Sequence, residues 1–544
     1  MLLQDYLARS AQRDPDRTAL VMGAERISYG QLEEATDRLA RLLQEYGCRP
    51  GDRVCLLAAK SVAAITGMLA VLKAGGAYVP IDGASPAARI VRMLASAEPR
   101  VVLIDAGAAG LVDELRASGG LAADVTIGSV SGPVTGERFE AVFTPADCAH
   151  HSGPPLRLRR APGSDAMAHI LFTSGSTGQP KGVVVTHASV VAFVEWAVSY
   201  FGTRPTDRIS GHPPLHFDLS TFDIFGTLAA GAELHLVPPG ASVNPHTLAG
   251  LIRDAELTQW FSVPSVLTYL RRFDAVAQGD FPALERLLWC GEVLPTPVLA
   301  HWMRRLPHVR FTNLYGPTEA TIASSFYTVP ACPADETQPV PIGTPCAGEE
   351  LLVLDERRQP VPAGEIGDLY IGGAGLSPGY WRDEERTAKA FVPDPRAPGS
   401  GTRIYRTGDL ARIGPTGQVE FLGRADSQIK SRGYRIELGE IEAAMSALDG
   451  VRECAVVGVD TGGFEGTAIC CAYIADQDLD PVALRRALSK ALPAYMLPAR
   501  WLALDALPKN CNGKIDRRRL REEFTQRMAA APAPARSLAG PTRR

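Results

Sequence analysis

Hydrophobic and polar residues alternate along the first hundred positions in segments that predict helices and strands by turns. Apolar residues recur at helical spacing over 32–47, a segment that ends at Gly47, and they dominate a second predicted helix over 62–76. The short apolar run at 52–59, between these two helices, is typical of a buried strand. Because strands that alternate with helices usually pair in parallel, we expect a largely parallel sheet with helices on its faces.

The pattern changes further along the chain. Residues 105–165 are rich in Gly, Ala, Ser and Pro and show little periodicity, so we expect an irregular stretch there. A second alternating block covers about 166–330, and short strands with Gly and Pro turns then predict a small β-rich subdomain over about 340–423. The segment that follows predicts a compact α+β unit of ordinary domain size. Its helices and strands are expected at 437–448, 453–460, 468–475 and 481–492.

These patterns together predict the α/β fold class. A large N-terminal domain, residues 1–425, should combine α/β subdomains with the small β-rich subdomain. A small α+β C-terminal domain should follow at 426–525. The remainder, 526–544, is rich in Ala and Pro and has the composition of a disordered tail.

Composition and charge narrow the class of function. Of the 544 residues, 46% are hydrophobic and 21% are charged, which is typical of a folded globular protein. The formal net charge of −4 argues against a nucleic-acid partner. No apolar run is long enough for a membrane span, and the charged N-terminus does not resemble a signal peptide. The ten cysteines include no CxxC pair, so we expect reduced thiols in a cytoplasmic protein, without a zinc site or a disulfide framework.

The segment 169–187 carries the first sign of chemistry. An apolar strand runs into six consecutive small residues, Thr173 to Gly178, which are followed by Lys181 and a second β-like run. Such a loop lets backbone N–H groups converge on an anion, and its hydroxyls and lysine add donors and charge. The loop does not match the G-x-x-x-x-G-K-[ST] phosphate motif. A flexible Ser/Gly surface turn is the alternative interpretation, but the strand before the loop and Lys181 after it favour phosphate binding.

This loop resembles the phosphate loop of adenylate-forming enzymes, the superfamily of acyl-CoA synthetases, luciferases and the adenylation domains of nonribosomal peptide synthetases. Further motifs similar to those of this family occur in family order and span almost the whole chain. The forms at 72–82 (LKAGGAYVPID) and 432–442 (RGYRIELGEIE) resemble those of amino-acid adenylation domains in particular. The other motifs are ISYGQL (27–32), NLYGPTEAT (313–321), GEIGDLYIGGAGLSPGYW (364–381), YRTGDL (405–410), GRADSQIKS (423–431) and NGKID (512–516).

The resemblance implies two chemical steps. A carboxylate attacks the α-phosphate of ATP to give an acyl-adenylate and pyrophosphate, and a thiol then displaces AMP to form a thioester. The first step brings two anions together, so the site must supply positive charge and rigid positioning. The cofactors implied are ATP, Mg²⁺ and the phosphopantetheine of a partner carrier protein, and the implied process is nonribosomal peptide synthesis in antibiotic biosynthesis.

The resemblance also assigns roles to residues. Lys514 should bridge the substrate carboxylate and the phosphate, Thr318 should contact the α-phosphate region, and Glu319 should help to hold Mg²⁺. Tyr315 should stack on adenine, and Asp409 should accept the ribose hydroxyls. Judged locally, Lys514 could be a solvated lysine, the NLYGPTE segment an ordinary turn, and Asp409 a turn cap. The expected ATP site comprises Thr173, Ser174, Gly175, Ser176, Thr177, Gly178, Lys181, Asn313, Tyr315, Gly316, Asp409, Phe421 and Arg424.

The C-terminal domain is expected to move. Asp426 matches the family hinge, about which the C-terminal domain rotates between an adenylating and a thioester-forming arrangement. The first arrangement brings Lys514 to the site, and the second brings the segment 430–440, with Gly433 beside the pantetheine channel. A surface turn is the alternative interpretation of Asp426. The family often has Tyr where this chain has Phe421, so any contact through that hydroxyl is absent.

The segment 216–225 (HFDLSTFDIF) bears on the kind of carboxylate. In amino-acid adenylation domains an aspartate here binds the substrate α-ammonium, and Asp218 holds that position. A carboxylate in an apolar stretch is costly to bury without a cation. The alternative is a helix N-cap formed by Asp218 and Ser220. The other pocket residues implied by the resemblance are Leu219, Phe222, Ser262, Leu288, Cys290, Gly291, Leu314, Ile322 and Ala323.

No charged side chain occurs among those pocket residues, and Phe222 with several aliphatic residues should leave little space. We therefore expect a small neutral L-α-amino acid as substrate: alanine first, then serine, cysteine, glycine or 2-aminobutyrate. We also expect a freestanding enzyme that hands its product to a separate acyl or peptidyl carrier protein. Two alternatives stay open: an acyl-CoA or aryl-CoA ligase of the same superfamily, and a catalytically inactive homologue that serves as a binding module.

Overall fold

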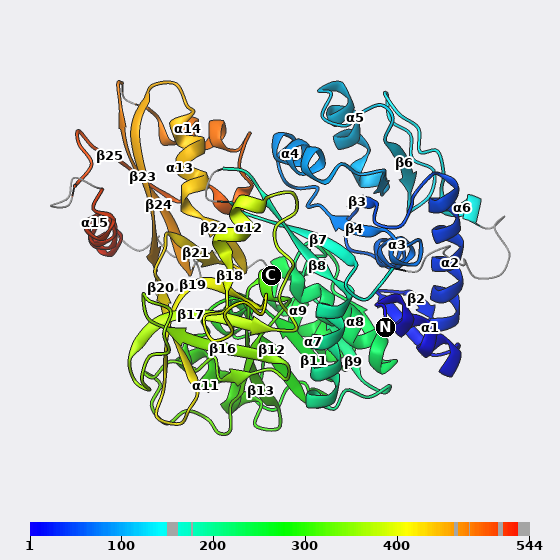
Figure 1. Ribbon diagram of the computed structural model, residues 1–544, viewed down its shortest axis with the longest axis horizontal. Helices are drawn as coiled ribbons and strands as arrows, with labels where there is room; N and C mark the ends of the chain where they lie inside the picture. The colour runs from blue at the N-terminus through cyan, green and yellow to red at the C-terminus, as the bar shows by residue number, and fades with distance from the viewer. Residues whose placement is uncertain (149–161, 176–177, 462–465, 478, 510–514, 531–544) are drawn as a thin grey trace, which may run out of the picture.

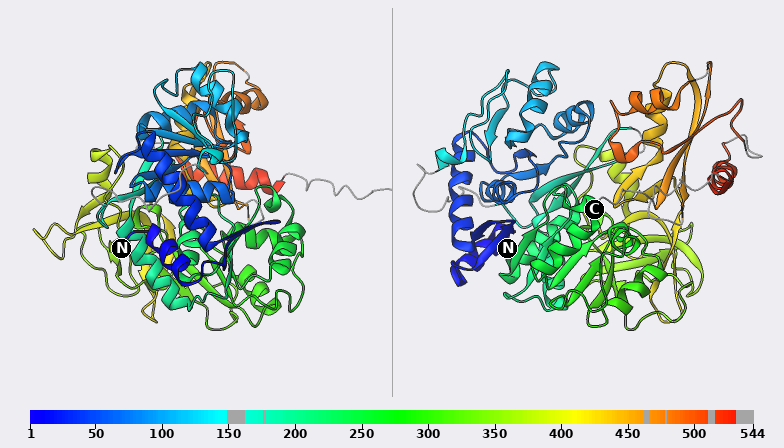
Figure 2. Two further views of the ribbon diagram at one scale, coloured as in Figure 1. Left: turned by 90° about the vertical axis from the view of Figure 1, so that its right-hand side faces the viewer. Right: turned by 180° about the vertical axis from the view of Figure 1, so that it is seen from behind.

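The computed structural model describes residues 1–148, 162–175, 178–461, 466–477, 479–509 and 515–530. Three lobes are visible in Figure 1 and again from behind in Figure 2: a first α/β lobe, a second lobe below it that carries the β-rich subdomain, and the C-terminal domain beside the first lobe. The site described below lies where the three lobes meet. The predicted α/β class, with a large N-terminal and a small C-terminal domain, is confirmed.

The first lobe is built on a six-stranded sheet in the order β6-β5-β3-β4-β7-β8. Its pairings are parallel, except that β8 returns antiparallel to β7. The predicted early strand and both early helices are confirmed as β3, α2 and α3. The elements are α2 (Tyr29–Glu45), β3 (Arg53–Leu57), α3 (Val62–Lys73), β4 (Ala77–Pro80), α4 (Ala87–Ala97), β5 (Val101–Ile104), η1 (Ala106–Ala108), α5 (Ala109–Ala117), β6 (Thr126–Ser129), α6 (Pro145–Cys148), β7 (Met167–Thr173) and β8 (Lys181–Thr186).

The expectation of an irregular stretch over 105–165 is wrong for its first part. Helix α5 forms there, and β6 extends the parallel sheet by pairing with β5. The strand has only four residues, Thr-Ile-Gly-Ser, so it carries almost no periodic signal. Its place is set by packing instead: Gly128 lies under the ring of Phe143, where a Cβ would come within 2.0 Å of the ring. Residues 149–161 lie outside the described residues.

The second lobe contains a nine-stranded sheet in the order β15-β14-β13-β12-β11-β9-β10-β1-β2. The chain's first strands join this sheet rather than the first one, because β1 pairs in parallel with β10. Its elements are α1 (Gln4–Arg13), β1 (Thr18–Met22), β2 (Glu25–Ser28), α7 (His187–Phe201), β9 (Arg208–Gly211), α8 (Asp218–Ala230), β10 (Glu233–Leu236), η2 (Ala241–Val243), α9 (Pro245–Asp254), β11 (Gln259–Ser262), α10 (Pro264–Arg272), β12 (Arg286–Trp289), α11 (Thr296–Arg305), β13 (Arg310–Tyr315), η3 (Thr318–Ala320), β14 (Ser325–Thr328) and β15 (Thr344–Pro345).

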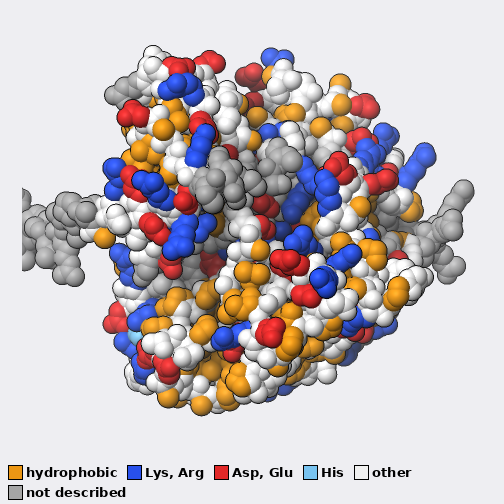
Figure 3. Space-filling view, turned by 60° about the vertical axis from the view of Figure 1, so that its left-hand side comes forward, with side chains coloured by type: hydrophobic (Ala, Val, Ile, Leu, Met, Phe, Trp, Pro, Cys, Tyr) orange, Lys and Arg blue, Asp and Glu red, His pale blue; other side chains and the backbone are white. Residues whose placement is uncertain are grey.

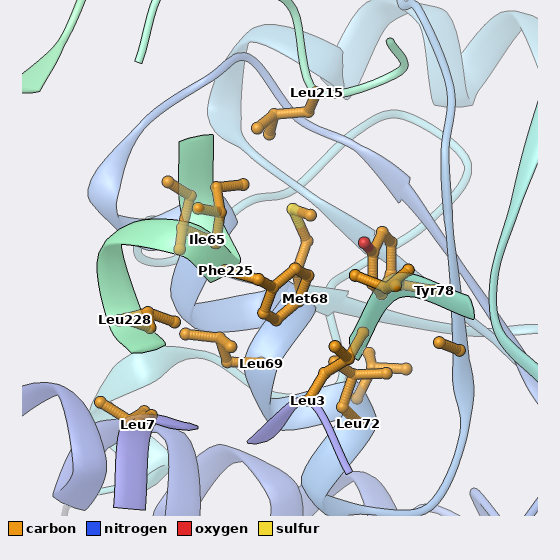
Figure 4. Packing of buried hydrophobic residues seen from close by; sticks show 14 of the residues in the cluster. Leu3, Leu7, Ile65, Met68, Leu69, Leu72, Tyr78, Leu215, Phe225 and Leu228 are labelled. Atoms are coloured by element: carbon orange, nitrogen blue, oxygen red, sulfur yellow. The ribbon is translucent and has the colours of Figure 1, made fainter. Parts of the chain in front are cut away.

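A single apolar core joins the two lobes. Met68 and Leu69 of α3 face Phe225 and Leu228 of α8, with Leu7 of α1 closing one side (Figure 4). Burial of such side chains contributes roughly 1.5–3 kcal/mol each. Helix α8 is buried on nearly every side, so its first residue, which belongs to the site, has a fixed position.

The β-rich subdomain and the C-terminal domain complete the fold. In the first, β16-β17-β19-β18 form a sheet to which β20 adds through β19. In the second, the hairpin β21–β22 precedes a three-stranded sheet in the order β23-β24-β25. The elements are β16 (Glu349–Leu354), β17 (Ile366–Gly373), α12 (Glu384–Ala390), β18 (Phe391–Pro393), β19 (Arg403–Ile413), β20 (Val419–Arg424), β21 (Gln428–Ser431), β22 (Tyr434–Glu437), α13 (Leu438–Ser446), β23 (Val451–Asp460), β24 (Thr467–Ala475), α14 (Pro481–Leu488), η4 (Ala494–Met496), β25 (Arg500–Ala503) and α15 (Arg517–Ala530).

The predicted start of a disordered tail at 526 is wrong, because α15 continues to Ala530. Leu520 and Phe524 of this helix are buried in the core of the C-terminal domain, which holds the helix in place. Residues 531–544 lie outside the described residues. Within the part of the chain that the structure describes, none of the helices combines the length and the hydropathy of a membrane span. Figure 3 shows charged side chains of both signs interspersed on one face.

Candidate active site

A cavity of about 130 Å³ lies between the two lobes and the C-terminal domain. Its walls come from the end of β7, the start of α8, the ends of β12 and β13, and the hairpin β21–β22. Ends of parallel strands are the usual place for a ligand in such folds. Lys60 of the first lobe fixes the entry to α8, because its ammonium donates to the carbonyl oxygens of Gly211 and His212, each at 2.6 Å.

The phosphate loop begins where β7 ends at Thr173, which lines the cavity. A Cβ on Gly175 would lie 2.1 Å from the carbonyl oxygen of Gln179, so only glycine fits there. The Ser174 hydroxyl donates to the carbonyl of Arg435 at 2.7 Å and accepts from the Glu437 N–H at 3.2 Å. In this arrangement the C-terminal domain therefore covers the loop. Ser176 and Thr177 lie outside the described residues, and Gly178 has a positive φ of 77°.

Glu319 lies at the centre of a buried charge cluster. Its side chain is 0% exposed, and the Lys181 ammonium, the Arg435 guanidinium and the Tyr380 hydroxyl lie 3.1, 2.6 and 2.7 Å from its oxygens. Burial opposes the charge, but Arg435 and Lys181 outweigh it and hold the pKa of Glu319 far below its usual value. Burial, with Arg435 close by, lowers the pKa of Lys181 although Glu319 opposes this. The cluster brings a loop lysine and the expected metal-binding carboxylate into contact.

Sequence reasoning assigned no role to Arg435, Tyr380 or Lys430. Arg435 belongs to the RGYRIELGEIE motif and Tyr380 to the motif at 364–381, so their place in recognised motifs was the available signal. Lys430 lines the cavity with its ammonium 5.6 Å from the centre of the Tyr315 ring. A cation over an aromatic face is weakly attractive.

Asp218 is the first residue of α8 and faces the cavity. The Thr318 hydroxyl donates to its carboxylate at 2.7 Å. Removal from water raises the pKa of Asp218 to about 6, and the nearby charge of Glu319 adds to this rise. The N-cap of α8 is Phe217, and the structure gives this helix no side-chain cap. The alternative interpretation of Asp218 as an N-cap is therefore wrong, and its carboxylate is directed into the site.

The predicted amino-acid pocket divides into two groups. Asp218, Leu219, Cys290 and Gly291 line the cavity. The remaining positions are buried behind that wall and do not belong to its described lining: Phe222, Ser262, Leu288, Leu314, Ile322 and Ala323.

Aromatic packing closes the wall behind the cavity. The ring of Phe222 meets the rings of Phe193 and Phe261 edge to face, at centroid distances of 5.3 and 5.7 Å. Such edge-to-face pairs pack tightly and hold a side chain in one position. Phe222 is thus fixed among aromatic neighbours and does not belong to the described lining of the cavity.

The expected nucleotide residues form a network at the other end of the cavity. The Tyr315 hydroxyl donates to Asp409, whose other oxygen accepts from Arg424. The rings of Tyr315 and Phe421 lie 6.4 Å apart. Tyr315 is 7% exposed and does not belong to the described lining of the cavity, whereas Asp409 and Arg424 do. Whether these groups hold adenine and ribose stays a prediction.

Two further predicted residues support the backbone here. The Asn313 side chain donates to the carbonyl of Pro341 at 2.8 Å, a contact that fixes β13. Gly316 lines the cavity, and a Cβ there would lie 2.5 Å from the Cα of Ala323. Asn313 thus acts on the fold of the site rather than on its surface.

The predicted hinge and channel residues lie at the domain junction. The Asp426 carboxylate pairs with Arg424 at 2.6 Å, and this pair outweighs the effect of burial and lowers the pKa of Asp426. The Gly433 N–H donates to the Glu292 carboxylate at 2.9 Å, and a Cβ on Gly433 would lie 2.8 Å from Val263. The hairpin β21–β22 thus enters the site. Lys514 lies outside the described residues.

The carboxylate of Glu319 fits a Mg²⁺ site in which the substrate phosphates supply some of the other ligands. Mg²⁺ usually takes one or two carboxylates from a protein and completes its shell with water and phosphate oxygens. Among the described residues, no group of three or more His, Cys, Asp or Glu could hold a metal by itself. Glu319 would supply the carboxylate once Arg435 has moved away from it.

Residues 7–381 match the AMP-binding enzyme family, and residues 440–514 match the AMP-binding enzyme C-terminal domain. The chain belongs to the AMP-binding enzyme family. The resemblance to adenylate-forming enzymes that the motifs of the sequence predicted is thereby confirmed. Among the described residues, Lys181 contacts Glu319 and Thr318 contacts Asp218, which speaks against the catalytically inactive alternative.

Among its relatives, tyrocidine synthase 3 of Brevibacillus parabrevis is 36% identical over 535 residues, which cover 98% of this chain. The chain spans only 8% of the length of that protein, and 8% and 14% of two further synthases.

Two solved structures of the family show the same fold. NpsA-ThdA, an artificially fused adenylation–PCP di-domain from Klebsiella oxytoca, has a TM-score of 0.77 at 26% identity and covers 92% of this chain and 93% of its own. The amide bond synthetase McbA of Marinactinospora thermotolerans has a TM-score of 0.84 at 26% identity, with coverage of 96% and 100%.

Proposed function

We propose that this AMP-binding enzyme activates a small neutral L-α-amino acid, with alanine favoured, as an aminoacyl-AMP. It then transfers the aminoacyl group to the phosphopantetheine thiol of a separate carrier protein in nonribosomal peptide synthesis. The observation that carries this proposal is the carboxylate of Asp218, directed into the cavity beside Thr318.

The surroundings of Asp218 favour an ammonium ligand. Its described side-chain partner is a neutral hydroxyl, and burial is the main cause of its pKa of about 6, which the charge of Lys430 offsets only in part. An α-ammonium bound there would supply a further positive charge and bring the pKa down again. A ligase for fatty or aryl acids has no cation to offer, so for such a substrate the carboxylate would be a cost.

The wall beside Asp218 supports a small side chain. Leu219 and Cys290 line it, and Phe222 is locked behind it by two aromatic neighbours. One methyl or hydroxyl group changes affinity in such a pocket by about 1–3 kcal/mol. We therefore expect graded selectivity, with alanine first and serine, cysteine, glycine and 2-aminobutyrate behind it.

The first step uses groups at the phosphate end. The proposed roles are that Lys181 neutralises the phosphates, Glu319 holds Mg²⁺, Thr318 orients the reacting phosphate, and Lys514 bridges the two anions. Mg²⁺, when bound, neutralises charge on the phosphate oxygens. Asp218 holds the ammonium group of the amino acid. The carboxylate of the same molecule is then positioned for in-line attack on the α-phosphate.

The arrangement of domains in this structure supports the second step of the proposal. With Gly433 against Val263, a second cavity of about 970 Å³ opens beside the hairpin β21–β22, lined in part by Arg432 and Tyr434. We assign this cavity to the pantetheine arm of the carrier. Rotation at Asp426 would then exchange this arrangement for the adenylating one.

Amino-acid-dependent exchange of labelled pyrophosphate into ATP tests the proposal. A panel of the twenty amino acids, with propionate and benzoate as amine-free acids, should show exchange with alanine and its small relatives only. Exchange that is fastest with an amine-free acid would overturn it and identify an acyl-CoA or aryl-CoA ligase. A best substrate with a large aromatic or charged side chain would overturn the pocket assignment.

A further inference from the structure

The loop 316–324, between β13 and β14, ends in a backbone conformation that its residues disfavour. The Ser324 N–H closes this loop by donating to the Tyr315 carbonyl at 2.7 Å. Just before this closure, Thr321 and Ile322 have φ values of 54° and 71°. A positive φ is unfavourable for a β-branched residue, and two in succession persist only where other contacts hold them.

One of these contacts comes from the Thr321 hydroxyl, which donates to the Gly375 carbonyl at 2.7 Å. Thr321 is 2% exposed, so this bond is shielded from water. Gly375 lies directly against the loop, because a Cβ there would come within 2.8 Å of the Ala320 carbonyl oxygen. The Ser377 N–H donates to the carbonyl of Glu319 at 2.9 Å. The segment that follows β17 thus supports the loop from behind.

Gly375 is held in turn by Glu349 of β16. The Gly375 N–H donates to one oxygen of the Glu349 carboxyl group at 2.6 Å, and the other oxygen is buried without a described partner. Burial raises the pKa of Glu349 to about 8, although the Gly375 N–H opposes this rise, so the group is mostly neutral at pH 7. The Gly375 peptide therefore links a neutral acid on β16 to the Thr321 hydroxyl.

The same loop carries two side chains of the candidate site. The Thr318 hydroxyl donates to Asp218 at 2.7 Å, and the Glu319 carboxylate contacts the Lys181 ammonium at 3.1 Å. Both residues lie close before Thr321 in the chain. Because the loop is closed, a change of φ at 321 would displace them together.

We propose that Thr321 is a positioning residue for adenylate formation. Its hydroxyl, anchored on the Gly375 peptide, keeps residues 321 and 322 at positive φ and thereby holds Thr318 and Glu319 in place. Thr321 does not belong to the described lining of either cavity, so it acts through these two neighbours. This inference rests on the first step of the proposed function, but not on the identity of the amino acid.

Three substitutions separate the hydroxyl from the backbone conformation. Thr321→Val keeps the branching but lacks the donor, so the kcat of pyrophosphate exchange should fall by about 10²-fold, the usual cost of a displacement of about 1 Å. Thr321→Ser keeps the donor and should remain near the native kcat. Thr321→Gly lacks the donor but accepts a positive φ without strain, so its kcat should lie between those of the other two. The assay uses the acid that the native chain activates fastest, well below each melting temperature.

A role in packing alone predicts the opposite order. Valine fills the space of threonine better than glycine does, so packing would leave Thr321→Val more active than Thr321→Gly. That order overturns the proposal, as does a native kcat in Thr321→Val with only a lowered melting temperature. Should Thr321→Val fail to fold, Thr321→Ala replaces it and must be less active than Thr321→Gly.

Thr312→Val is the matched control for the loss of a buried threonine hydroxyl. Thr312 is 0% exposed on β13, and its hydroxyl pairs with that of Thr328 at 2.8 Å, outside the loop. Its kcat should stay at the native value, and a fall equal to that of Thr321→Val would overturn the proposal.

Glu349 is tested by a second matched pair. Glu349→Gln keeps an acceptor for the Gly375 N–H and should retain the native kcat. Glu349→Leu removes the acceptor and should lower kcat, although less than Thr321→Val does, because the Thr321 hydroxyl remains. A native kcat in Glu349→Leu would overturn the link through Gly375.

The crystal structure of Thr321→Val tests the geometry without any reaction. Residue 321 should have a negative φ, and the Thr318 hydroxyl should lie beyond hydrogen-bond distance of Asp218. A positive φ with that bond intact would overturn the proposal. A native chain that exchanges no pyrophosphate with any acid would instead overturn the proposed function, and the crystal structure would still decide the role of Thr321.

Discussion

Asp218 and Glu319 are neighbouring carboxylates of the candidate site, and their surroundings differ in a way that separates their proposed roles. Glu319 has no exposure and is surrounded by Lys181, Arg435 and Tyr380, which hold its pKa far below the usual range. Asp218 faces the cavity with Thr318 as its hydrogen-bond partner, and its pKa is raised to about 6.

The difference shows which charge the protein completes by itself. At Glu319 the protein supplies the cations Lys181 and, in this arrangement, Arg435, which suits the phosphate binding that we propose there. At Asp218 the protein supplies an anion, and in the proposed function the ammonium group of the ligand completes the pair. Glu319 is neutralised by the protein, whereas Asp218 is proposed to be neutralised by the substrate. Such a site would select substrates that carry an ammonium group.

The largest expected effect is that of replacing Asp218. Asp218→Ala leaves a bound ammonium unpaired in a confined site, which costs several kcal/mol. Pyrophosphate exchange should therefore fall by about 10³-fold or more with every α-amino acid alike.

Asp223→Asn is the matched control for that prediction. Asp223 lies on the same helix, is 1% exposed, and has a pKa raised well above its usual value mainly by burial. It does not line the described cavity, so its amide variant should retain exchange. Loss that is confined to alanine in Asp218→Ala would contradict the role assigned to this carboxylate.

Replacing Glu319 should affect both half-reactions. Glu319→Gln keeps the shape of the side chain but leaves Lys181 and Arg435 without their anion, and breaking a buried ion pair costs about 3–5 kcal/mol. Both half-reactions should slow by about 10²-fold, and the melting temperature should fall. Thermal unfolding and single-turnover assays of each half-reaction measure this. A variant that loses adenylation but transfers a preformed adenylate at the native rate would show that the Arg435 contact is dispensable.

The contrast between these two acids was only partly predictable from the sequence. Lys181, Glu319 and Asp218 were identified because each lies in a motif, and strands such as β3 were identified because an apolar run leaves few other choices. The pairs Arg435–Glu319 and Arg89–Glu440 join residues 116 and 351 positions apart, and no local pattern carries such information. The orientation of Asp218 was likewise undetermined until α8 was seen to begin without a side-chain cap.

The pH dependence of activity distinguishes the two carboxylates without any substitution. A raised pKa means that Asp218 keeps its proton up to pH of about 6, and the protonated acid cannot pair with an ammonium. The kcat/KM for the amino acid should therefore fall about tenfold per pH unit below that value. Because the pKa of Glu319 is lowered, its titration causes no second fall of kcat/KM in this pH range. Pyrophosphate exchange between pH 4.5 and 8 measures the profile, and an identical acid limb in the residual activity of Asp218→Asn would contradict the assignment.

The smallest expected effect concerns the wall beside Asp218. Cys290 lines the cavity at 1% exposure, and burial raises the pKa of its thiol to about 12, so the neutral thiol acts as a small apolar group. Cys290→Ala removes one sulfur atom and leaves space for about one methylene, which is worth about 0.8 kcal/mol when buried. The ratio of kcat/KM for 2-aminobutyrate to that for alanine should therefore rise about fourfold. Cys346→Ala is the matched control, because Cys346 is equally buried but does not line the described cavity, so its ratio should stay at the native value. Equal ratios in the two variants would show that the substrate side chain does not reach Cys290, and would place the small-residue pocket on another wall of the cavity.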